Sequence, residues 1–137
     1  MAYRIRRIDY FYTCVKDEPG EALKLLNELA AHRINLLAFA AVPTGVMRTL
    51  LTLFPEDTPQ LVEASRRARL DLDGPYGAIL VQGDDELGAT AGIHEKLFEA
   101  NVNVFASSGV ADGRGSYGYV IYVRPEEYER ALKALEI

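Results

Sequence analysis

Two short acidic segments that end in glycine are the residues of this sequence best suited to hold a small ligand. The first is DEPG at residues 17–20 and the second is DELG at residues 85–88, and apolar residues at helical spacing follow both. A loop that opens a helix presents unpaired backbone N–H groups, and the helix start carries partial positive charge. Gly20 and Gly88 let the backbone approach a ligand without a clashing Cβ. The chemistry that these segments suit is the binding of a small carboxylate.

The two segments belong to an internal repeat with a constant offset of 68 residues. The offset aligns Gly20 with Gly88 and Asn35 with Asn103, and it needs no gap between the acidic segment and the end of this block. Further aligned pairs are Leu25 with Ile93, Leu29 with Leu97, and Ile34 with Val102. Self-similarity at a fixed distance indicates a duplicated structural unit. We therefore predict two repeats, residues 1–74 and residues 75–137.

Composition indicates a compact protein that does not bind polyanions in general. The 137 residues are 49% hydrophobic and carry a net charge of −5, whereas affinity for nucleic acid and anionic lipid depends largely on Lys and Arg. Cys14 is the single cysteine, so the chain forms no internal disulfide. No secretory segment follows Met1, and no apolar run is long enough to span a bilayer. We expect a reduced, cytoplasmic setting.

Periodicity in the first repeat predicts the order strand, helix, strand, strand, helix. Apolar and aromatic residues alternate around Tyr10 and Tyr12, which is typical of a strand. Thr58 followed by Pro59 predicts a helix N-cap with proline in the first turn. The expected strands cover residues 8–15, 34–42 and 48–54, and the expected helices follow Gly20 and Thr58.

The second repeat shows the same order. Its expected strands cover residues 78–82, 102–108 and 117–124, with helices over 87–100 and from Pro125. Pro55 matches Pro125 if the second hairpin holds two extra residues. Residues 71–75 are a candidate fourth strand for the first repeat, and the long run from Tyr3 is a candidate for the second. The prediction is an α+β, ferredoxin-like βαββαβ fold in tandem, with antiparallel sheets and helices on one face.

The motif VKDEPG at residues 15–20, a helix, and RINL at residues 33–36 together resemble the ACT domain, a small regulatory module that binds amino acids. The second repeat keeps VNV at residues 102–104 but has Leu87 where proline is expected. The whole chain is similar to a stand-alone tandem ACT protein without an attached enzyme domain. The resemblance implies a regulatory protein that binds an amino acid or related metabolite and signals through oligomerisation, as a homodimer, or through contact with a partner.

The resemblance also implies where the ligand lies: between the acidic loop and a neighbouring unit, with the residue after the helix contributing. Its carboxylate would meet the helix start, and its ammonium group would meet a carboxylate or carbonyl such as Asp17, Asp84 or Asp85. The implied ligand-binding residues are Asp17, Glu18, Pro19, Gly20, Glu21 and Asn35, followed by Asp85, Glu86, Gly88, Ala89 and Asn103. The alternative is that both glycines only make tight strand-to-helix turns.

Two other functions compete with ligand sensing. One is a purely structural oligomerisation module. The other is RNA binding, because RGSYGYVIY at residues 114–122 resembles the central strand motif of RNA-recognition motifs. Against it, Ser116 displaces the basic-Gly start, residues 78–82 hold no aromatic, and the charge is acidic. Tyr117 and Tyr119 fall on one sheet face and Tyr122 on the other, and tyrosines on a helix-free face would be covered by a second chain or the other repeat.

No residue pattern favours catalysis, a metal or a cofactor, so we predict a binding protein rather than an enzyme. The histidines, His32 and His94, do not align with each other under the 68-residue offset. Zinc-binding spacings are absent from the sequence. Cys14 on a strand reads as a packed thiol, and Ser107 lacks the strand-to-helix elbow of a serine hydrolase.

Overall fold

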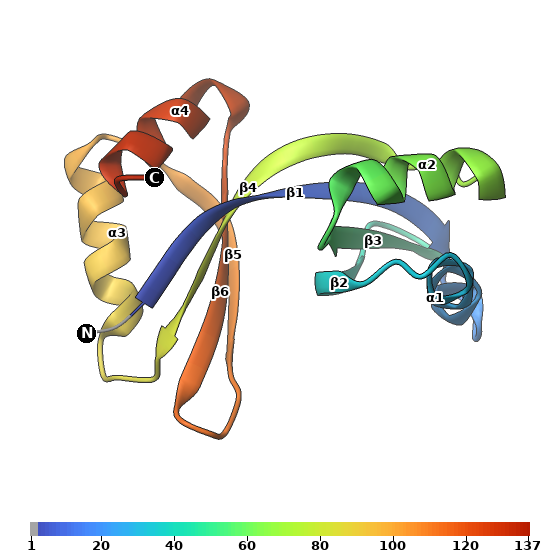
Figure 1. Ribbon diagram of the computed structural model, residues 1–137, viewed down its shortest axis with the longest axis horizontal. Coiled ribbons are helices and arrows are strands. Elements are labelled where there is room, and N and C mark those ends of the chain that lie inside the picture. Colours follow the sequence, from blue (N-terminus) through green and yellow to red (C-terminus); the bar gives the residue numbers. More distant parts are fainter. Residues whose placement is uncertain (1–2) are drawn as a thin grey trace. The chain divides into compact units, whose positions relative to one another are not determined.

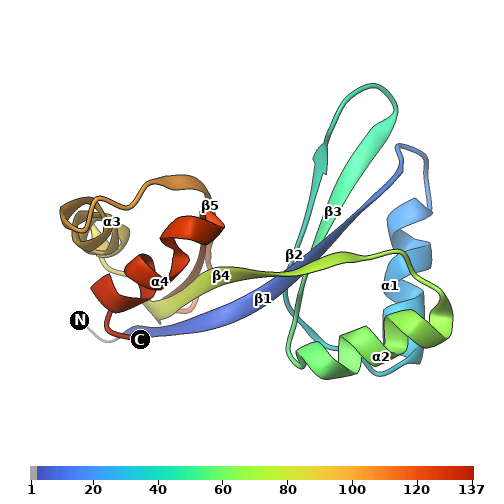
Figure 2. The same cartoon turned by 90° about the horizontal axis from the view of Figure 1, so that it is seen from above.

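The computed structural model describes residues 3–137 and shows an α+β protein with alternating strands and helices (Figures 1 and 2). The elements of the first half are β1 (Tyr3–Lys16), α1 (Glu21–Ala31), β2 (Leu36–Pro43), β3 (Arg48–Pro55) and α2 (Thr58–Ala68). The elements of the second half are β4 (Asp73–Asp84), α3 (Ala89–Glu99), β5 (Val104–Ala111), β6 (Ser116–Val123) and α4 (Pro125–Ala134).

The duplication found in the sequence is also present in the structure. Three pairs of elements, α1 with α3, β2 with β5 and β3 with β6, begin and end at positions 68 residues apart. The helix ends match in detail: the Ile34 amide donates to Leu29 and the Val102 amide donates to Leu97, both at 2.9 Å. Each helix is followed by a residue of positive φ, 60° at Arg33 and 58° at Asn101. The two repeats therefore share one backbone plan.

The predicted insertion in the second hairpin is wrong. Because β3 and β6 keep the offset to their last residues, Pro55 is equivalent to Val123 rather than to Pro125. Pro125 instead occupies the first turn of α4, as Pro59 does in α2. A proline fits there because the first helical N–H groups have no partner within the helix. The length difference between repeats lies between the last strand of each hairpin and the helix that follows.

The sequence predicts Thr58 as the N-cap of α2, but the N-cap is Asp57. The Asp57 carboxylate accepts from the Gln60 amide at 3.0 Å, which satisfies one of the free N–H groups at the helix start. Thr58 is the first helical residue, and its hydroxyl donates to Asp9 Oδ2 at 2.8 Å. Two adjacent residues can both cap, so sequence alone leaves the boundary open by one position.

Residues 9–76 form the first of two compact units. Their strand order is β2-β3-β1-β4, with β1 and β2 both antiparallel to β3. Phe11 of β1 lies opposite Leu53 of β3, and both belong to a core that α1 and α2 cover on one face of the sheet (Figure 2). The buried residues of this core are Phe11, Leu25, Leu29, Leu51, Leu53 and Leu61.

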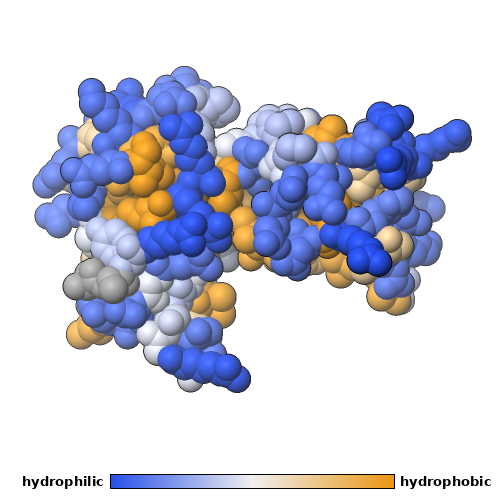
Figure 3. Space-filling view, in the orientation of Figure 1, coloured by the Kyte–Doolittle hydropathy of each residue, from blue (hydrophilic) through white to orange (hydrophobic). Residues whose placement is uncertain are grey.

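The second unit combines residues 77–137 with the described residues up to Ile8. Its strand order is β1-β4-β6-β5, and β6 is antiparallel to both β4 and β5. Its core lies between the sheet and helices α3 and α4, with Ile79, Val81, Ile93, Leu97 and Leu132 almost fully buried. In Figure 3 apolar atoms are visible between α3 and α4, within a largely hydrophilic surface.

Strands β1 and β4 each contribute to both units. Tyr3 and Ile5 of β1 pack against the core of the second unit, so the N-terminal run supplies the strand that the second repeat lacked. The contact units therefore differ from a cut between residues 74 and 75, which remains our prediction for the limits of the duplicated sequence. No helix within residues 3–137 has the length and apolar character needed to cross a membrane.

Candidate functional site

The two acidic loops have the same backbone hydrogen bonds. The Asp17 amide donates to the Met47 carbonyl, and the Asp85 amide donates to the Gly115 carbonyl, each at 2.8 Å. Each loop is thereby fastened to the turn of its own repeat's hairpin, β2–β3 or β5–β6. The start of the following helix is thus held at a fixed place against the sheet in both repeats.

Both loops need glycine because of their backbone conformation. Gly20 has φ of 87° and Gly88 has φ of 76°, in the left-handed region that other residues enter at a cost. A Cβ built on either glycine meets no atom within 4 Å. The space in front of each helix start is therefore open.

The helix start of α3 offers an uncapped amide. The N-cap Gly88 has no side chain to accept a hydrogen bond, so no side chain caps the first amides of α3. Neighbouring amides are satisfied within the turn, since the Ala89 amide donates to Glu86 and the Ala91 amide donates to Gly88, both at 3.1 Å. An amide at the positive end of a helix is a donor for an anionic group.

A pocket of about 360 Å³ opens directly beside this helix start. Pockets that hold small molecules in proteins have volumes of about 300–1,000 Å³. The acidic loop and the first residues of α3 form one side, and β5 and β6 form the other. The lining residues are Asp85, Glu86, Gly88, Ala89, Thr90, Gly109, Val110, Ala111, Tyr117, Gly118 and Tyr119.

Tyr117 lines this pocket, and its hydroxyl is buried. Its side chain is only 9% exposed, and its hydroxyl has no hydrogen-bond partner among the described residues. Burial, with a smaller contribution from the charges of Tyr3 and Glu86, raises the pKa of the Tyr117 hydroxyl above its usual value. The hydroxyl therefore stays protonated at neutral pH and can donate a hydrogen bond.

The hydroxyl of Tyr119, the second tyrosine that lines the pocket, is hydrogen-bonded within the protein. The Tyr119 hydroxyl lies 2.5 Å from His94 Nε2 and 2.9 Å from Ser107 Oγ. Its ring lies over Gly109, where an added Cβ would be 2.8 Å from Tyr119 Cδ1. Contacts from two other elements, α3 and β5, thus hold the Tyr119 ring of β6 in place.

A smaller pocket of about 220 Å³ lies beside α1 in the first unit. Glu21 lines it, together with Lys24, Leu25 and Glu28 of the same helix. The remaining lining residues are Thr13, Val15, Leu70, Asp71 and Leu72. This pocket follows the side of the helix and is not lined by residues 17–20.

Two of the expected site residues lie away from both pockets. Asn35 follows the C-terminal end of α1, whereas Gly20 precedes the start of this helix. The side-chain amide of Asn35 donates to Glu56 at 2.5 Å. Asn103 holds the equivalent place after α3, where its backbone N–H lies 3.5 Å from Glu127 Oε1. Within each unit, the helix itself separates these asparagines from the glycine loops.

Of the residues expected to bind a ligand, those of the second loop gather in one pocket: Asp85, Glu86, Gly88 and Ala89. Asp17, Glu18, Pro19 and Gly20 form an exposed loop. The sequence reasoning did not assign Thr90, Gly109, Tyr117 or Tyr119 to the site. Comparison of the repeats could have drawn attention to the two tyrosines. At the 68-residue offset, the first repeat has Thr49 and Leu51 where the second has Tyr117 and Tyr119.

Tyr117 and Tyr119 lie on the helix-covered face of the sheet, so they are not the exposed contact surface considered from the sequence. Tyr119 is opposite Val81 on β4, and both belong to the core under α3 and α4 or pack against it. The pair therefore cannot form an open platform on which RNA bases stack. Tyr122 points to the other face and lies near Phe105, with ring centroids 6.3 Å apart.

Other candidate chemistry gains little support from the geometry. No group of three or more His, Cys, Asp and Glu side chains suited to a metal occurs in residues 3–137. Cys14, expected to be packed, is exposed, because it lies on the sheet face opposite to Phe11 and the helices.

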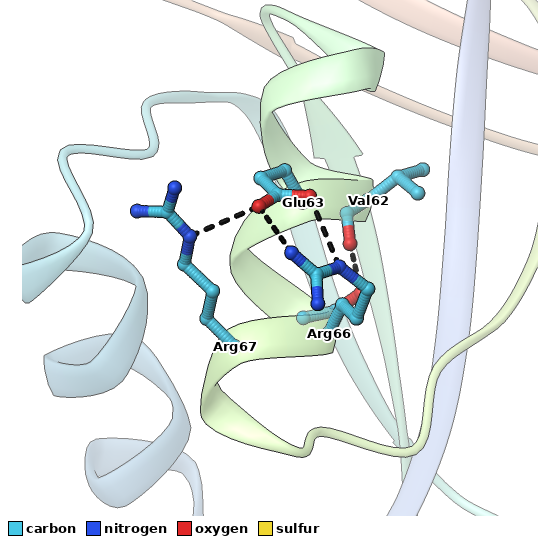
Figure 4. A network of polar contacts seen from close by, with 5 residues as sticks. Val62, Glu63, Arg66 and Arg67 are labelled. Atoms are coloured by element: carbon cyan, nitrogen blue, oxygen red, sulfur yellow. Dashed lines mark hydrogen bonds and ion pairs between the residues drawn. The ribbon is translucent and has the colours of Figure 1, made fainter.

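Glu63 pairs with Arg66 at 2.6 Å and with Arg67 at 2.9 Å on the surface of α2 (Figure 4).

No protein-family model matches the chain, and no curated protein matches its sequence. Solved structures do match. Protein BT0572 from Bacteroides thetaiotaomicron is 14% identical with a TM-score of 0.80, over 96% of this chain and 88% of that one. The ligand-free regulatory subunit of aspartate kinase from Thermus thermophilus is 14% identical with a TM-score of 0.65, over 98% and 94% of the two chains. The corresponding subunit from Thermus flavus is 16% identical with a TM-score of 0.61, over 98% and 94%. The chain therefore has a tandem ACT-like fold, which it shares with regulatory subunits of aspartate kinase.

Proposed function

We propose that this protein is a small regulatory protein that binds an amino acid, or a related small metabolite, in the pocket beside the start of α3. The observation that carries the proposal is that an acidic loop, a helix start without a side-chain cap and the Tyr117 side chain line one pocket. The fold shared with regulatory subunits of aspartate kinase supports a regulatory role. In this proposal the chain acts by binding and not by catalysis.

The ligand carboxylate would lie against the start of α3. No side chain caps the first amides of α3, and the positive end of the helix macrodipole favours a negative charge. In this proposal the Tyr117 hydroxyl, which is buried and has no partner among the described residues, turns toward the ligand and donates a further hydrogen bond. A charge-assisted hydrogen bond of this kind is worth about 1.5–3 kcal/mol, more than a neutral one.

The ligand ammonium group would lie on the acidic side of the pocket. Asp85 and Glu86 line it, and both side chains are exposed. Their negative charges attract an ammonium group and oppose a second anionic group on the ligand. Among small carboxylates, the site thus favours zwitterions over dianions.

The first loop remains a second predicted site, formed by Asp17, Glu18, Pro19, Gly20 and Glu21. Its glycine conformation and its anchoring hydrogen bond repeat those of the second loop. Asn35 and Asn103 would contribute only across an interface with a neighbouring unit, because neither lines the pocket described beside the helix of its own unit.

Occupancy would be transmitted through a change in association, with a homodimer as the expected assembly. Linkage requires that the ligand bind one assembly better than the other, because equal affinity shifts no equilibrium. Gel filtration with and without the bound amino acid measures this step. A structural oligomerisation module without a ligand would show the same assembly in both conditions.

Thermal unfolding of the full chain with each of the twenty amino acids tests the proposal. A ligand that binds only the folded state raises Tm. At a hundredfold excess over Kd it adds about 2.7 kcal/mol to the free energy of unfolding. Tyr117→Phe should weaken binding by about 2- to 10-fold through the lost donor. Thr49→Val, at the equivalent place in the first repeat, is the matched control and should leave it unchanged. A melting temperature that no amino acid raises contradicts the proposal.

A further inference from the structure

We propose that the α3 pocket selects ligands with an apolar side chain, and that Tyr119, held by His94 and Ser107, is the residue that determines this specificity. The inference rests on the proposed function and adds to it the class of side chain that the site accepts. It starts from a chain of three polar side chains beside the pocket.

These three side chains come from three elements. His94 lies on α3, Tyr119 on β6 and Ser107 on β5. The His94 and Tyr119 rings are 5.8 Å apart and tilted by 45°, with the Tyr119 hydroxyl between His94 Nε2 and Ser107 Oγ. Both hydrogen bonds of the hydroxyl are therefore made within the protein.

The first repeat provides an internal comparison. At the positions equivalent to His94, Ser107 and Tyr119 it carries three apolar residues, Leu26, Phe39 and Leu51. Leu51 is fully buried in the core of its unit. The same backbone plan thus accepts a purely apolar layer at this place.

An apolar layer is the less costly choice for stability. Partly burying a hydroxyl and an imidazole requires desolvation, which hydrogen bonds must offset. Because the first repeat folds without this polar chain, folding alone does not require it in the second. Tyr119 lines the pocket beside α3, whereas Leu51 is not among the residues that line the pocket beside α1.

The polar chain determines which part of Tyr119 faces a ligand. Since His94 and Ser107 occupy the hydroxyl, the ring is what the side chain offers to the pocket. Gly109 lies under the ring, and Ala111 extends the same wall along β5. This side of the pocket is apolar and carries no ionised group among its lining residues.

The two sides of the pocket therefore have different chemistry. Asp85, Glu86 and the start of α3 suit the charged groups of an amino acid. The wall of Tyr119, Gly109 and Ala111 suits an apolar side chain, and a charged side chain would lose its hydration there without gaining a partner. An aromatic side chain gains most, because paired rings contribute about 0.5–1.5 kcal/mol beyond their buried area.

Calorimetric titration of the full chain with L-phenylalanine, L-alanine and L-aspartate tests the inference. We expect phenylalanine to bind at least 10-fold more tightly than alanine, and aspartate to bind weakest. Tyr119→Leu, which restores the residue of the first repeat, should lower the phenylalanine-to-alanine ratio by about 2- to 10-fold. The ratio does not depend on the folded fraction, so loss of stability alone cannot produce this change.

His94 acts as a positioning residue, and its variants separate that role from a structural one. His94→Leu should lower the same ratio, whereas His94→Gln, which keeps a donor for the Tyr119 hydroxyl, should preserve most of it. Ser107→Ala, at an exposed position, should lower this ratio less than His94→Leu does. His32→Leu alters the other histidine, at the end of α1, and should leave the ratio unchanged.

The outcomes are distinct. If alanine or aspartate binds as tightly as phenylalanine, the specificity inference is wrong but the proposed function still stands. A Tyr119→Leu variant that weakens all three ligands equally also overturns it. Absence of binding by any amino acid contradicts the proposed function itself, and the specificity inference falls with it.

Discussion

Burial of the Tyr117 side chain affects stability at alkaline pH. Folding raises the pKa of this hydroxyl, mainly through burial, and it raises the pKa of Tyr10 for the same leading reason. An acid whose folded pKa is raised is stabilised in its protonated form. That stabilisation is complete below the unfolded pKa of about 10 and is lost as pH rises through the folded pKa.

The Tyr117→Phe variant should therefore resist alkaline pH better than the wild type. Its free energy of unfolding should fall less between pH 9 and 11, a range set around the tyrosine pKa of about 10. At pH 7 the variant should be neutral or stabilised by about 1 kcal/mol, because it removes a buried hydroxyl without a partner in the described chain. Urea unfolding across pH measures both effects. A variant that is several kcal/mol less stable at pH 7 would show that the hydroxyl has a strong partner.

Glycine substitutions in and beside the loop should have opposite signs. Gly88→Ala should destabilise the protein by about 1 kcal/mol, because φ of 76° is costly for alanine. Gly92→Ala should stabilise it by about 0.5–1 kcal/mol, since Gly92 is inside α3, is exposed and has open space around a Cβ. Chemical denaturation of the two variants measures the difference. Equal effects would contradict the left-handed conformation of the loop.

At the residue scale, four of the residues that line the candidate pocket are ones that the sequence predicted to bind a ligand. Asp85, Glu86, Gly88 and Ala89 are contiguous in the chain, so a local motif finds them together. Tyr117 and Tyr119 join them through the pairing of β6 with β4 and β5, which depends on long-range register. Alternation alone does not say which sheet face the helices cover, and for this reason the tyrosines were not assigned to the pocket.

At the element scale, α3 is stabilised by its apolar face rather than by its sequence propensity. Ile93 and Leu97 are almost fully buried against the sheet of the second unit, whereas Phe98 on the same helix is 81% exposed. A short helix with two interior-facing aliphatic residues depends on this packing. Substitutions on the two faces of α3 should therefore differ greatly in their effect.

Ile93→Ala should cost about 2–5 kcal/mol of stability, because it removes buried methyl groups and leaves a cavity. Phe98→Ala, the larger truncation, should change stability by about 0.5 kcal/mol or less, because the side chain is exposed. Equilibrium denaturation in urea compares the two. A Phe98→Ala variant that is the more destabilised would show that this side chain is covered in solution.

The repeat allowed the elements to be predicted together, because each expected helix and strand had a second copy as a check. The errors occurred where the copies diverge. The segment after β3 is longer than the one after β6, and the Pro-Glu pair shared by residues 55–56 and 125–126 suggested a false alignment of Pro55 with Pro125. At the start of α2, Asp57 and Thr58 are both good caps, and only the Gln60 hydrogen bond distinguishes them.

At the scale of the whole molecule, the two repeats are separate in sequence but share strands in the structure. β1 supplies Phe11 to the core of the first unit and Ile5 to the periphery of the core in the second. This sharing follows from the length of β1, Tyr3–Lys16, which runs beyond what a single unit needs. The sequence showed the long run but not which sheet its first residues join, because strand pairing across that distance has no local signal.

A fragment of residues 75–137 should therefore not fold as it does in the full chain. It lacks Tyr3 and Ile5, which pack against the second core, and it lacks the strand that pairs at that edge. An open edge and a reduced core leave so small a chain marginal. Far-ultraviolet circular dichroism and amide dispersion compare the fragment with the full chain. A fragment with a cooperative transition and a native-like spectrum would contradict the shared-strand description.

The most direct measurement for the central claim is a titration of the isotopically labelled full chain, followed through its backbone amide resonances. With the amino acid that most raises Tm, the amides of Gly88, Ala89 and Thr90 should shift progressively to saturation, and Tyr117→Phe should require more ligand to reach the same shift. Saturation of the protein with no change at residues 85–90 would contradict binding at the α3 pocket.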